Sequence, residues 1–416
     1  MKVHFSFLCI LFITLISFGQ EFEVTPPEFI KTIEFKGSNQ NLSGTPIIPL
    51  NGKLSLSFDD LTAQEADYYY TIKHYNNDWT ESDLARNEYL EGFDNIRMLN
   101  FVNSLNTLQS FTHYKEVFPN NNIRRFKVSG NYMLFIKDGS GRTIFSRKFI
   151  VYENLVDVKT EIRRSRDLEY LREKQVLYFS IGRDGFIFRN PDQTVKVALV
   201  QNQDHNEAIY GLKPQFTQGN NLIYRYDDEA SFYGGNEYLF FDNNDIRMAT
   251  QRVQRIELNE LYHTHLRIDR VRDGKKYIFN PDVNGGFKIN TQQGEDPRIE
   301  AEYAWVHFYL NNTKDLNGGE LHLYGRFNNY TIDDNTLMTF NEESQLYENK
   351  KLLKQGFYNY NYVYLGPDGS FDPGFISGNH DITENQYQII VYYRDIGERF
   401  DRVVGVGEAN SKNIIN

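Results

Sequence analysis

The chain contains 416 residues, of which 40% are hydrophobic and 24% charged, and its formal net charge is -11. This acidic balance argues against a nucleic-acid-binding protein, because such proteins neutralise phosphates with basic side chains. A mean hydropathy of -0.58, with no long apolar run after residue 20, excludes a polytopic helical membrane protein. The 32 Phe and 29 Tyr indicate a folded core, since disordered chains lack apolar surface.

The first residues have the layout of a secretory signal peptide. Lys2 gives a positive start, residues 5–16 are mainly apolar, and Ser17 and Gly19 place small side chains at the −3 and −1 positions before a cleavage point. We therefore predict a signal peptide over 1–19 and export of the mature chain; the alternative is a buried N-terminal strand or helix. Because Cys9 lies inside the peptide, the mature chain has neither disulfides nor thiolate metal sites.

Alternation of polar and apolar residues predicts strands along most of the chain. Residues 132–137 and 143–151 flank the sequence Asp-Gly-Ser-Gly and predict a hairpin, because glycine tolerates the positive φ of a tight turn. The remaining predicted strands have the same two-residue period and are 53–58, 176–181, 195–201, 305–310, 320–324, 358–365 and 386–393. Helices are scarce; residues 165–174 favour a short one, with Ser165 as its cap.

Many short strands joined by polar turns predict an all-β protein built of tandem immunoglobulin-like β-sandwiches. The chain divides at Asn154, where the hairpin ends and a charged stretch begins, and at the polar segment 291–297. We therefore expect an N-terminal sandwich over 20–154, a middle sandwich over 155–295 and a C-terminal sandwich over 296–416, after the signal peptide 1–19.

His263 and His265 are two residues apart and would share one face of a strand, which suits two ligands of a metal ion. Glu257 and Asp269 are nearby, but neither stands at a convincing ligand spacing. The alternative is a solvated or hydrogen-bonded histidine pair. We predict no metal and no cofactor for this chain.

Known catalytic motifs are missing from the sequence. It contains no Gly-rich phosphate loop, no nucleophile elbow and no metalloprotease helix motif. A carboxylate pair for glycoside hydrolysis remains open, because such pairs are defined by their distance in space. We predict a noncatalytic protein with no small-molecule substrate.

The C-terminal unit contains a Gly-Arg-Phe-Asn-Asn-Tyr turn at 325–330 and an aromatic strand at 355–365. This pattern resembles the immunoglobulin-like, glycogen-binding type of carbohydrate module. Tyr330 replaces the tryptophan that stacks on a sugar in that module. A carbohydrate-binding or surface-assembly protein is therefore the alternative function, and an aromatic sandwich core is the structural alternative.

The N-terminal unit contains six motifs in close order: WTESDL (79–84), EYLEGF (88–93), SLNT (104–107), FTHY (111–114), FPN (118–120) and SGNY (129–132). Together they resemble the Plug protein family of the Bacteroidetes type IX secretion system, over about residues 22 to 405. The resemblance implies a noncatalytic periplasmic β-sandwich protein, which does not itself span the membrane. It implies one partner, the giant outer-membrane β-barrel translocon, whose periplasmic end the protein binds and seals.

The segment 79–120 is long, irregular and rich in these motifs, and long loops often carry function. We predict that it contacts the partner barrel. The candidate interface residues are Trp79, Tyr89, Phe93, His113, Tyr114 and Phe118. The alternative is that these aromatic residues fill a sandwich core and that His113 bonds to a neighbouring side chain.

Overall fold

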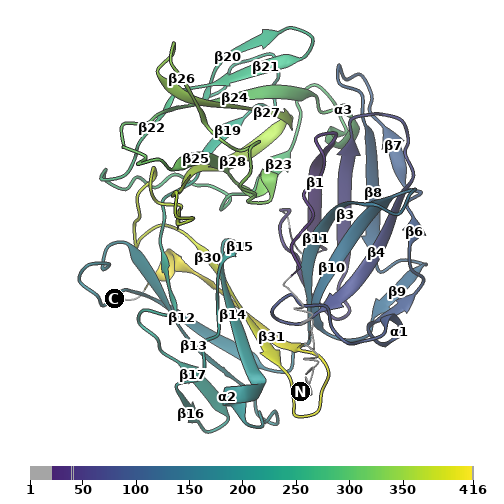
Figure 1. Ribbon diagram of the computed structural model, residues 1–416, viewed down its shortest axis with the longest axis vertical. Coiled ribbons are helices and arrows are strands. Elements are labelled where there is room, and N and C mark those ends of the chain that lie inside the picture. The colour runs from purple at the N-terminus through teal and green to yellow at the C-terminus, as the bar shows by residue number, and fades with distance from the viewer. Residues whose placement is uncertain (1–20, 39, 41, 415–416) are drawn as a thin grey trace, which may run out of the picture.

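The computed structural model describes residues 21–38, 40 and 42–414. The predicted signal peptide 1–19, with Cys9, lies outside the described residues. The described chain forms three β-sandwiches arranged around a common centre (Figure 1). In the part of the chain that the structure describes, no helix has the length and apolar character needed to cross a membrane. The predicted all-β class is confirmed.

The first sandwich is formed by the N-terminal part of the chain. One of its sheets has the strand order β1-β3-β8-β7, the other has the order β2-β11-β10-β4-β6, and β5 pairs with β9 in a small ribbon. Apolar side chains from both sheets form one core between Ile30 and Val151. The strands are β1 Ile30–Gly37, β2 Ile47–Pro49, β3 Leu54–Asp60, β4 Tyr68–Tyr75, β5 Leu90–Gly92, β6 Ile96–Arg97, β7 Phe101–Asn103, β8 Thr112–Phe118, β9 Ile123–Phe126, β10 Gly130–Asp138 and β11 Thr143–Tyr152.

The second sandwich combines two distant parts of the chain. One sheet has the order β12-β13-β17-β16, with β18 also paired to β13, and the other has the order β15-β14-β30-β31. The strands are β12 Asp157–Arg164, β13 Lys174–Gly182, β14 Val195–Gln201, β15 Asp204–Tyr210, β16 Phe216–Gln218, β17 Asn221–Tyr224, β18 Ser231–Tyr233, β30 Gln386–Tyr393 and β31 Arg402–Asn410.

The third sandwich is inserted between β18 and β30. Its sheets are β19-β28-β23, with β25 and β29 also paired to β28, and β20-β21-β24-β27-β26, with β22 paired to β24. The strands are β19 Leu239–Asp242, β20 Val253–Leu258, β21 Tyr262–Leu266, β22 Asp269–Arg270, β23 Phe287–Ile289, β24 Tyr303–Asn311, β25 Glu320–Tyr324, β26 Thr339–Asn341, β27 Leu346–Lys354, β28 Gly356–Leu365 and β29 Phe371–Asp372.

This insertion corrects the expected units 155–295 and 296–416. Strands β21 and β24 lie on opposite sides of residue 295 but pair in one sheet, from Tyr262↔Ala304 to His265↔His307. Strand β30 belongs to the second sandwich, where Val195 is paired with Tyr393. The boundary at 295 is therefore wrong. The polar segment 291–297 is a loop within the third sandwich, and composition alone did not distinguish it from a linker.

Each of the predicted strands is present, and the predicted hairpin is formed by β10 and β11. The predicted helix over 165–174 is wrong, because residues 168–173 form successive turns before β13 begins at Lys174. Ser165 does accept a hydrogen bond from the backbone N–H of Asp167, at 3.1 Å. Leu168 remains 88% exposed, so the segment has no apolar face to bury.

Helical segments are limited to single turns in the described chain. They are the α-helices α1 Arg86–Tyr89, α2 Pro191–Thr194 and α3 Pro297–Glu300, and the 3-10 helices η1 Arg326–Asn328 and η2 Ser411–Asn413. Asp296 caps α3 by accepting a hydrogen bond from the backbone N–H of Arg298 at 3.1 Å. This turn lies where the third sandwich meets the first (Figure 1).

Candidate functional site

The six predicted interface residues are not gathered on one surface. Phe93 is 65% exposed, whereas Tyr114 and Phe118 are fully buried in the core of the first sandwich. Tyr89 is also part of that core. Trp79 and His113 lie in two separate contacts between sandwiches, which are described below. The structural alternative therefore describes five of the six residues, and only Phe93 has an exposed ring.

Trp79 lies in an apolar contact between the first and second sandwiches. Its side chain is 2% exposed and packs beside Tyr75, and Lys148 Nζ lies 4.4 Å from its ring centroid. The outward faces of two sheets meet here, one from each sandwich. The first sandwich contributes Tyr75, Trp79, Met133, Phe135 and Ile150, and the second contributes Ala198, Val200, Ile390, Tyr392 and Val403. Trp79 is thus an intramolecular anchor.

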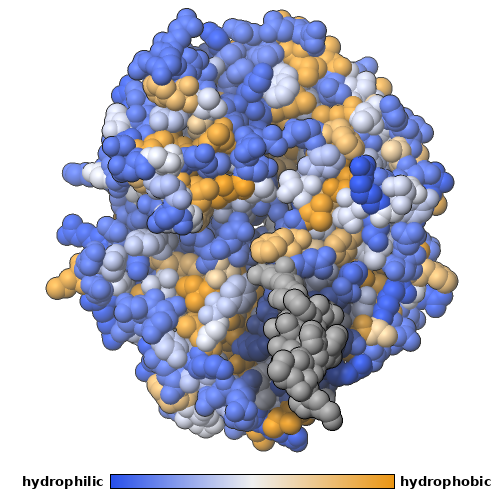
Figure 2. Space-filling view, viewed as in Figure 1, coloured by the Kyte–Doolittle hydropathy of each residue, from blue (hydrophilic) through white to orange (hydrophobic). Residues whose placement is uncertain are grey.

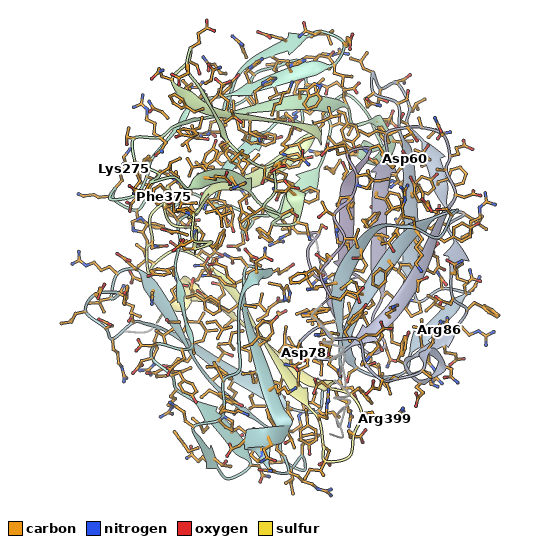
Figure 3. The ribbon with its side chains drawn as sticks, in the orientation of Figure 1. Asp60, Asp78, Arg86, Lys275, Phe375 and Arg399 are labelled. Atoms are coloured by element: carbon orange, nitrogen blue, oxygen red, sulfur yellow. The ribbon has the colours of Figure 1, made fainter. Side chains whose placement is uncertain are left out.

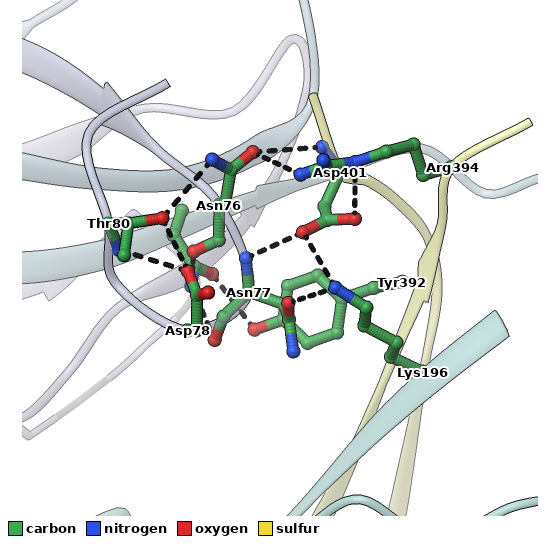
Figure 4. A network of polar contacts seen from close by, with 9 residues as sticks. Asn76, Asn77, Asp78, Thr80, Lys196, Tyr392, Arg394 and Asp401 are labelled. Atoms are coloured by element: carbon green, nitrogen blue, oxygen red, sulfur yellow. Dashed lines mark hydrogen bonds and ion pairs between the residues drawn. The ribbon is translucent and has the colours of Figure 1, made fainter. Parts of the chain in front are cut away.

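A polar network borders this apolar contact (Figure 4). The buried carboxylate of Asp401 accepts hydrogen bonds from the backbone N–H of Asn77 at 3.1 Å and from Arg394 Nε at 2.9 Å. Lys196 Nζ lies 3.5 Å from the same carboxylate. Arg394 also donates to the side-chain oxygen of Asn76 at 2.6 Å. Two cations therefore neutralise Asp401, and the network fixes the 76–80 turn against the second sandwich.

The loop between β30 and β31 extends the same contact. Arg399, labelled in Figure 3, pairs with the carboxylate of Glu88 and donates to the backbone carbonyl of Asp83 at 3.4 Å. Both partners belong to the first sandwich, near α1. Because these groups are exposed, their attraction is screened by solvent and adds little to stability.

His113 lies in a different contact, between the first and third sandwiches. Its Nδ1 is 2.6 Å from Asp59 Oδ1, and Lys354 Nζ donates to Asp59 Oδ2 at 2.7 Å. The Tyr303 hydroxyl donates to the same oxygen at 2.7 Å. Asp59 and Lys354 are fully buried. Burial opposes ionisation of Asp59, but the Lys354 charge and the hydrogen bond with His113 hold the pKa of Asp59 below its usual value.

One arginine connects all three sandwiches. Arg326, in η1 of the third sandwich, is 7% exposed. Its guanidinium donates to the carbonyl of Ser43 in the first sandwich at 3.1 Å and to that of Asn202 in the second at 3.0 Å. A further bond of 2.9 Å reaches the carbonyl of Asn284 in the third. A planar guanidinium suits this role because its donors point in fixed directions.

Tyr330, the residue in the carbohydrate-module position, is also buried at this centre. It is 5% exposed, and its ring lies 5.0 Å from that of Tyr324. Its hydroxyl donates to the carbonyl of Asn202 at 3.3 Å. The aromatic strand at 355–365 contributes Tyr358, Tyr360 and Tyr362 to the core of the third sandwich. These aromatic rings are therefore core residues, and Tyr330 offers no free face to a sugar.

A cleft of about 440 Å³ opens near the same centre. Its walls come from all three sandwiches, including Lys148 of the first, Asn206 of the second and Phe371 of the third. The described N-terminal segment enters it, and Glu23 accepts a hydrogen bond from Asn329 at 2.6 Å. The cleft is therefore part of the junction between the sandwiches.

Buried acidic groups lie at the contact between the second and third sandwiches. Burial raises the pKa of Asp204 to about 6 and that of Asp282 to about 7. Asp204 accepts a hydrogen bond from the Tyr324 hydroxyl at 2.5 Å, and Asp282 accepts one from the backbone N–H of Tyr238 at 2.6 Å. Asp204 thus connects the second sandwich to the third, whereas Asp282 is bonded within the third sandwich.

His263 and His265 are joined by a third histidine that sequence spacing did not reveal. His307 lies on the neighbouring strand β24, and one ring nitrogen of each histidine lies within 4.8 Å of the others. Burial and the neighbouring His265 and His263 lower the pKa of His307 to about 4, so its imidazole is neutral at pH 7. The two histidines do form hydrogen bonds, as the alternative to a metal pair expected: His263 pairs with His307 and His265 with Tyr309.

Exposed apolar side chains recur along one segment of the first sandwich, between residues 93 and 108. We call this group the apolar edge; its members are Phe93, Leu99, Val102, Leu105 and Leu108, which are 42–71% exposed. The group borders β6 and β7, each of which is the end strand of its sheet within the described chain. Elsewhere, on the face shown in Figure 2, apolar patches are interspersed with hydrophilic residues. The apolar edge is the candidate partner surface.

Comparison with known protein families gives a match to the first sandwich. A family model described as the type 9 secretion system plug protein 1st domain matches residues 30–153. The chain belongs to the plug protein family of the type 9 secretion system. The matched range corresponds to the first sandwich, from β1 at Ile30 to β11 at Tyr152. Membership of this family indicates a noncatalytic structural role in the secretion machinery and a periplasmic location.

A solved structure extends the similarity to nearly the whole chain. The crystal structure of a hypothetical protein from Parabacteroides merdae is 31% identical to this chain and superposes with a TM-score of 0.90. The similarity covers 94% of this plug-family chain and 99% of the other. No curated protein matches the chain. The same three-sandwich arrangement is therefore shared with that hypothetical protein.

Proposed function

We propose that this chain seals the periplasmic end of the giant outer-membrane β-barrel of the type 9 secretion system. The observation that carries the proposal is the match of the first sandwich to the plug domain. The predicted signal peptide agrees with it, because a protein that acts from the periplasm must be exported.

The contacts between the sandwiches support a sealing role. A seal must keep its shape against the rim of a wide pore, and separate domains on flexible linkers would not. Here an apolar contact, a buried ion pair and the Arg326 guanidinium connect the three sandwiches into one body. Such a body blocks a pore by its bulk and needs no catalytic group.

We assign the barrel contact to the apolar edge of the first sandwich. Exposed apolar side chains are common in protein–protein contacts, and this segment contributes five of them. Strands β6 and β7 are the end strands of their sheets within the described residues, and an end strand can pair with a further strand or loop. Phe93 and Leu99 are the most exposed members of the group, at 65% and 71%, and are expected to contribute most.

The test is co-purification from the native host. An affinity tag after Asn416 is used to recover the chain from membranes extracted with mild detergent. We expect the giant barrel in near-equal amount with the unmodified chain, and at least about a tenfold lower yield with Phe93→Asp and Leu99→Asp combined, because a central apolar anchor contributes about 2 kcal/mol or more.

Ile187→Asp is the matched control, because Ile187 is 73% exposed on the second sandwich, away from the apolar edge. This variant should recover the barrel as the unmodified chain does. Recovery of the chain alone from cells with an intact barrel would exclude stable sealing. Equal recovery by all variants would keep the seal but move the contact elsewhere.

A further inference from the structure

Three histidines converge on the outward face of a sheet in the third sandwich. Along β24, Val306, Phe308 and Leu310 point into the core, so His307 points outward. The parallel strand β21 places His265 in register with His307. His263, two residues earlier, lies on the same face of β21. The sheet itself therefore brings together side chains that are 44 residues apart in sequence.

The distances suit a shared ion. His263 Nδ1 and His307 Nε2 are 2.9 Å apart. One ring nitrogen from each of the three histidines lies within 4.8 Å of the other two. In a tetrahedral zinc site, with metal–nitrogen distances of about 2.0–2.1 Å, neighbouring nitrogens are about 3.3 Å apart. The distance between His263 and His307 is shorter than this value, and the 4.8 Å limit for the three nitrogens is longer. The three rings are stacked nearly parallel, with interplanar angles of 13–27°, so they must turn about their side-chain bonds before their lone pairs point at a shared ion.

The surrounding groups complete the arrangement. The Tyr309 hydroxyl lies 2.7 Å from His265 Nδ1 and orients the ring, which leaves Nε2 available. This Nε2 is buried without a hydrogen-bond partner, although Glu257 Oε2 lies 3.3 Å away. In metal sites, a ligand histidine commonly uses one nitrogen for the metal and the other for such an orienting bond. Glu257, on β20 opposite His263, supplies a carboxylate at the open side.

We propose that His263, His265 and His307 bind one divalent transition-metal ion of the zinc type, with Glu257 or water as the fourth ligand. Imidazole nitrogens favour zinc, copper and nickel, whereas magnesium and calcium prefer oxygen ligands. The ion would replace the contact between His263 and His307 and would join β20, β21 and β24. It would therefore stabilise the outer sheet of the third sandwich.

Zinc titration of the full mature chain, purified without a histidine tag and freed of metal with a chelator, tests the proposal. Calorimetry should show one Zn²⁺ per chain, and Mg²⁺ should not bind. His307→Gln should weaken zinc binding by at least about 100-fold, since it removes a ligand rather than an orienting group. Substitution with Co²⁺ should give the visible absorption of a four-coordinate site, which His307→Gln abolishes.

Two further variants separate a metal site from a histidine stack. Tyr309→Phe keeps all three imidazoles and should weaken zinc binding by about tenfold, because it removes only the orienting hydroxyl. His380→Gln changes a histidine of the loop before β30 and should leave zinc binding unchanged. If His307→Gln does not fold, His263→Gln serves instead, because its ring is only half-buried.

Either of two results would overturn the proposal. One is the absence of stoichiometric binding at zinc concentrations of about 100 μM, where a three-ligand protein site should be filled. The other is binding that persists in the folded His263→Gln and His307→Gln variants. Neither result bears on the sealing function, which is measured by recovery of the barrel.

Discussion

The first sandwich meets its two neighbours through contacts of opposite character. Its contact with the second sandwich buries ten apolar side chains, five from each sandwich, and charged groups remain at the border of the contact. Against the third it buries the charged pair of Asp59 and Lys354, together with Tyr303 and His113. An apolar contact stabilises the protein in proportion to the apolar area that it buries, so a substitution costs stability in proportion to the buried area that it removes. A buried ion pair depends on every partner, because loss of one leaves an uncompensated charge.

The difference indicates how the three sandwiches divide their tasks. The apolar contact supplies most of the free energy that joins the sandwiches and tolerates similar apolar replacements. The buried pair contributes little net stability, since desolvation of both charges offsets their attraction. It favours one arrangement of the first and third sandwiches, in which the donors and acceptors match. A body that must fit the rim of a pore needs both properties.

The largest expected effect is at the buried pair. Lys354→Met leaves the Asp59 carboxylate buried with only His113 and Tyr303 as partners, and should lower the free energy of unfolding by about 3–5 kcal/mol. Urea unfolding of the whole chain, followed by tyrosine fluorescence, measures this change. The double variant Asp59→Asn with Lys354→Met should recover part of the loss. A cost below about 1 kcal/mol for the single variant would contradict an essential charge pair.

The apolar contact should respond in proportion to the volume removed. Ile390→Ala deletes part of a fully buried side chain at the contact and should cost about 2–4 kcal/mol, whereas Ile390→Val should cost about 1 kcal/mol. The same urea measurement compares the two variants. If Ile390→Ala and Ile390→Val lowered the free energy of unfolding equally, the contact would depend on the exact shape of the side chain and not on the volume that it fills.

The Arg326 centre should show an intermediate effect. Arg326→Lys keeps the charge but cannot reach the carbonyls of Ser43, Asn202 and Asn284 together. We expect a loss of about 1–3 kcal/mol. Hydrogen exchange should increase at the segments around those three carbonyls. Exchange within the hairpin β16–β17, which contributes no residue to the Arg326 contacts, is the internal control and should not change.

The last expected effect is a pH dependence that comes from a buried carboxyl group of the third sandwich, Asp282. Burial raises the pKa of Asp282 to about 7, above its usual value near 4. The folded chain therefore binds this proton more tightly than the unfolded chain, and stability falls as pH rises from about 4 to about 7. At about 1.4 kcal/mol per pKa unit, a shift of this size corresponds to a loss of about 4 kcal/mol across that range.

Asp282→Asn tests the assignment, because the amide cannot ionise. In this variant the urea midpoint at pH 7.5 should approach the value at pH 5. The other carboxylates are the same in the variant and in the unmodified chain, so their contribution to the pH dependence cancels in the comparison. An unchanged pH profile would assign the effect to another group, for example Asp204, whose pKa burial raises to about 6.

The candidate surface was only partly predictable from sequence. The motif-dense segment 79–120 does contain the apolar edge, but only Phe93 was named among its members. Tyr114 and Phe118 alternate along β8 and point inward, and the alternation itself was visible. Trp79 and His113 could not be distinguished from exposed residues, because the sheets that cover them come from distant parts of the chain.

The sequence by itself determined the all-β class, the strands and the family. Two-residue alternation is a local property, since successive side chains of a strand point to opposite faces. Ordered motifs in the first sandwich were enough to indicate the plug family. Only the tertiary structure decided that β30 and β31 return to the second sandwich, that Tyr330 is buried and that His307 joins His263 and His265. These features depend on which strands pair across long separations, and a local pattern contains no information about that choice.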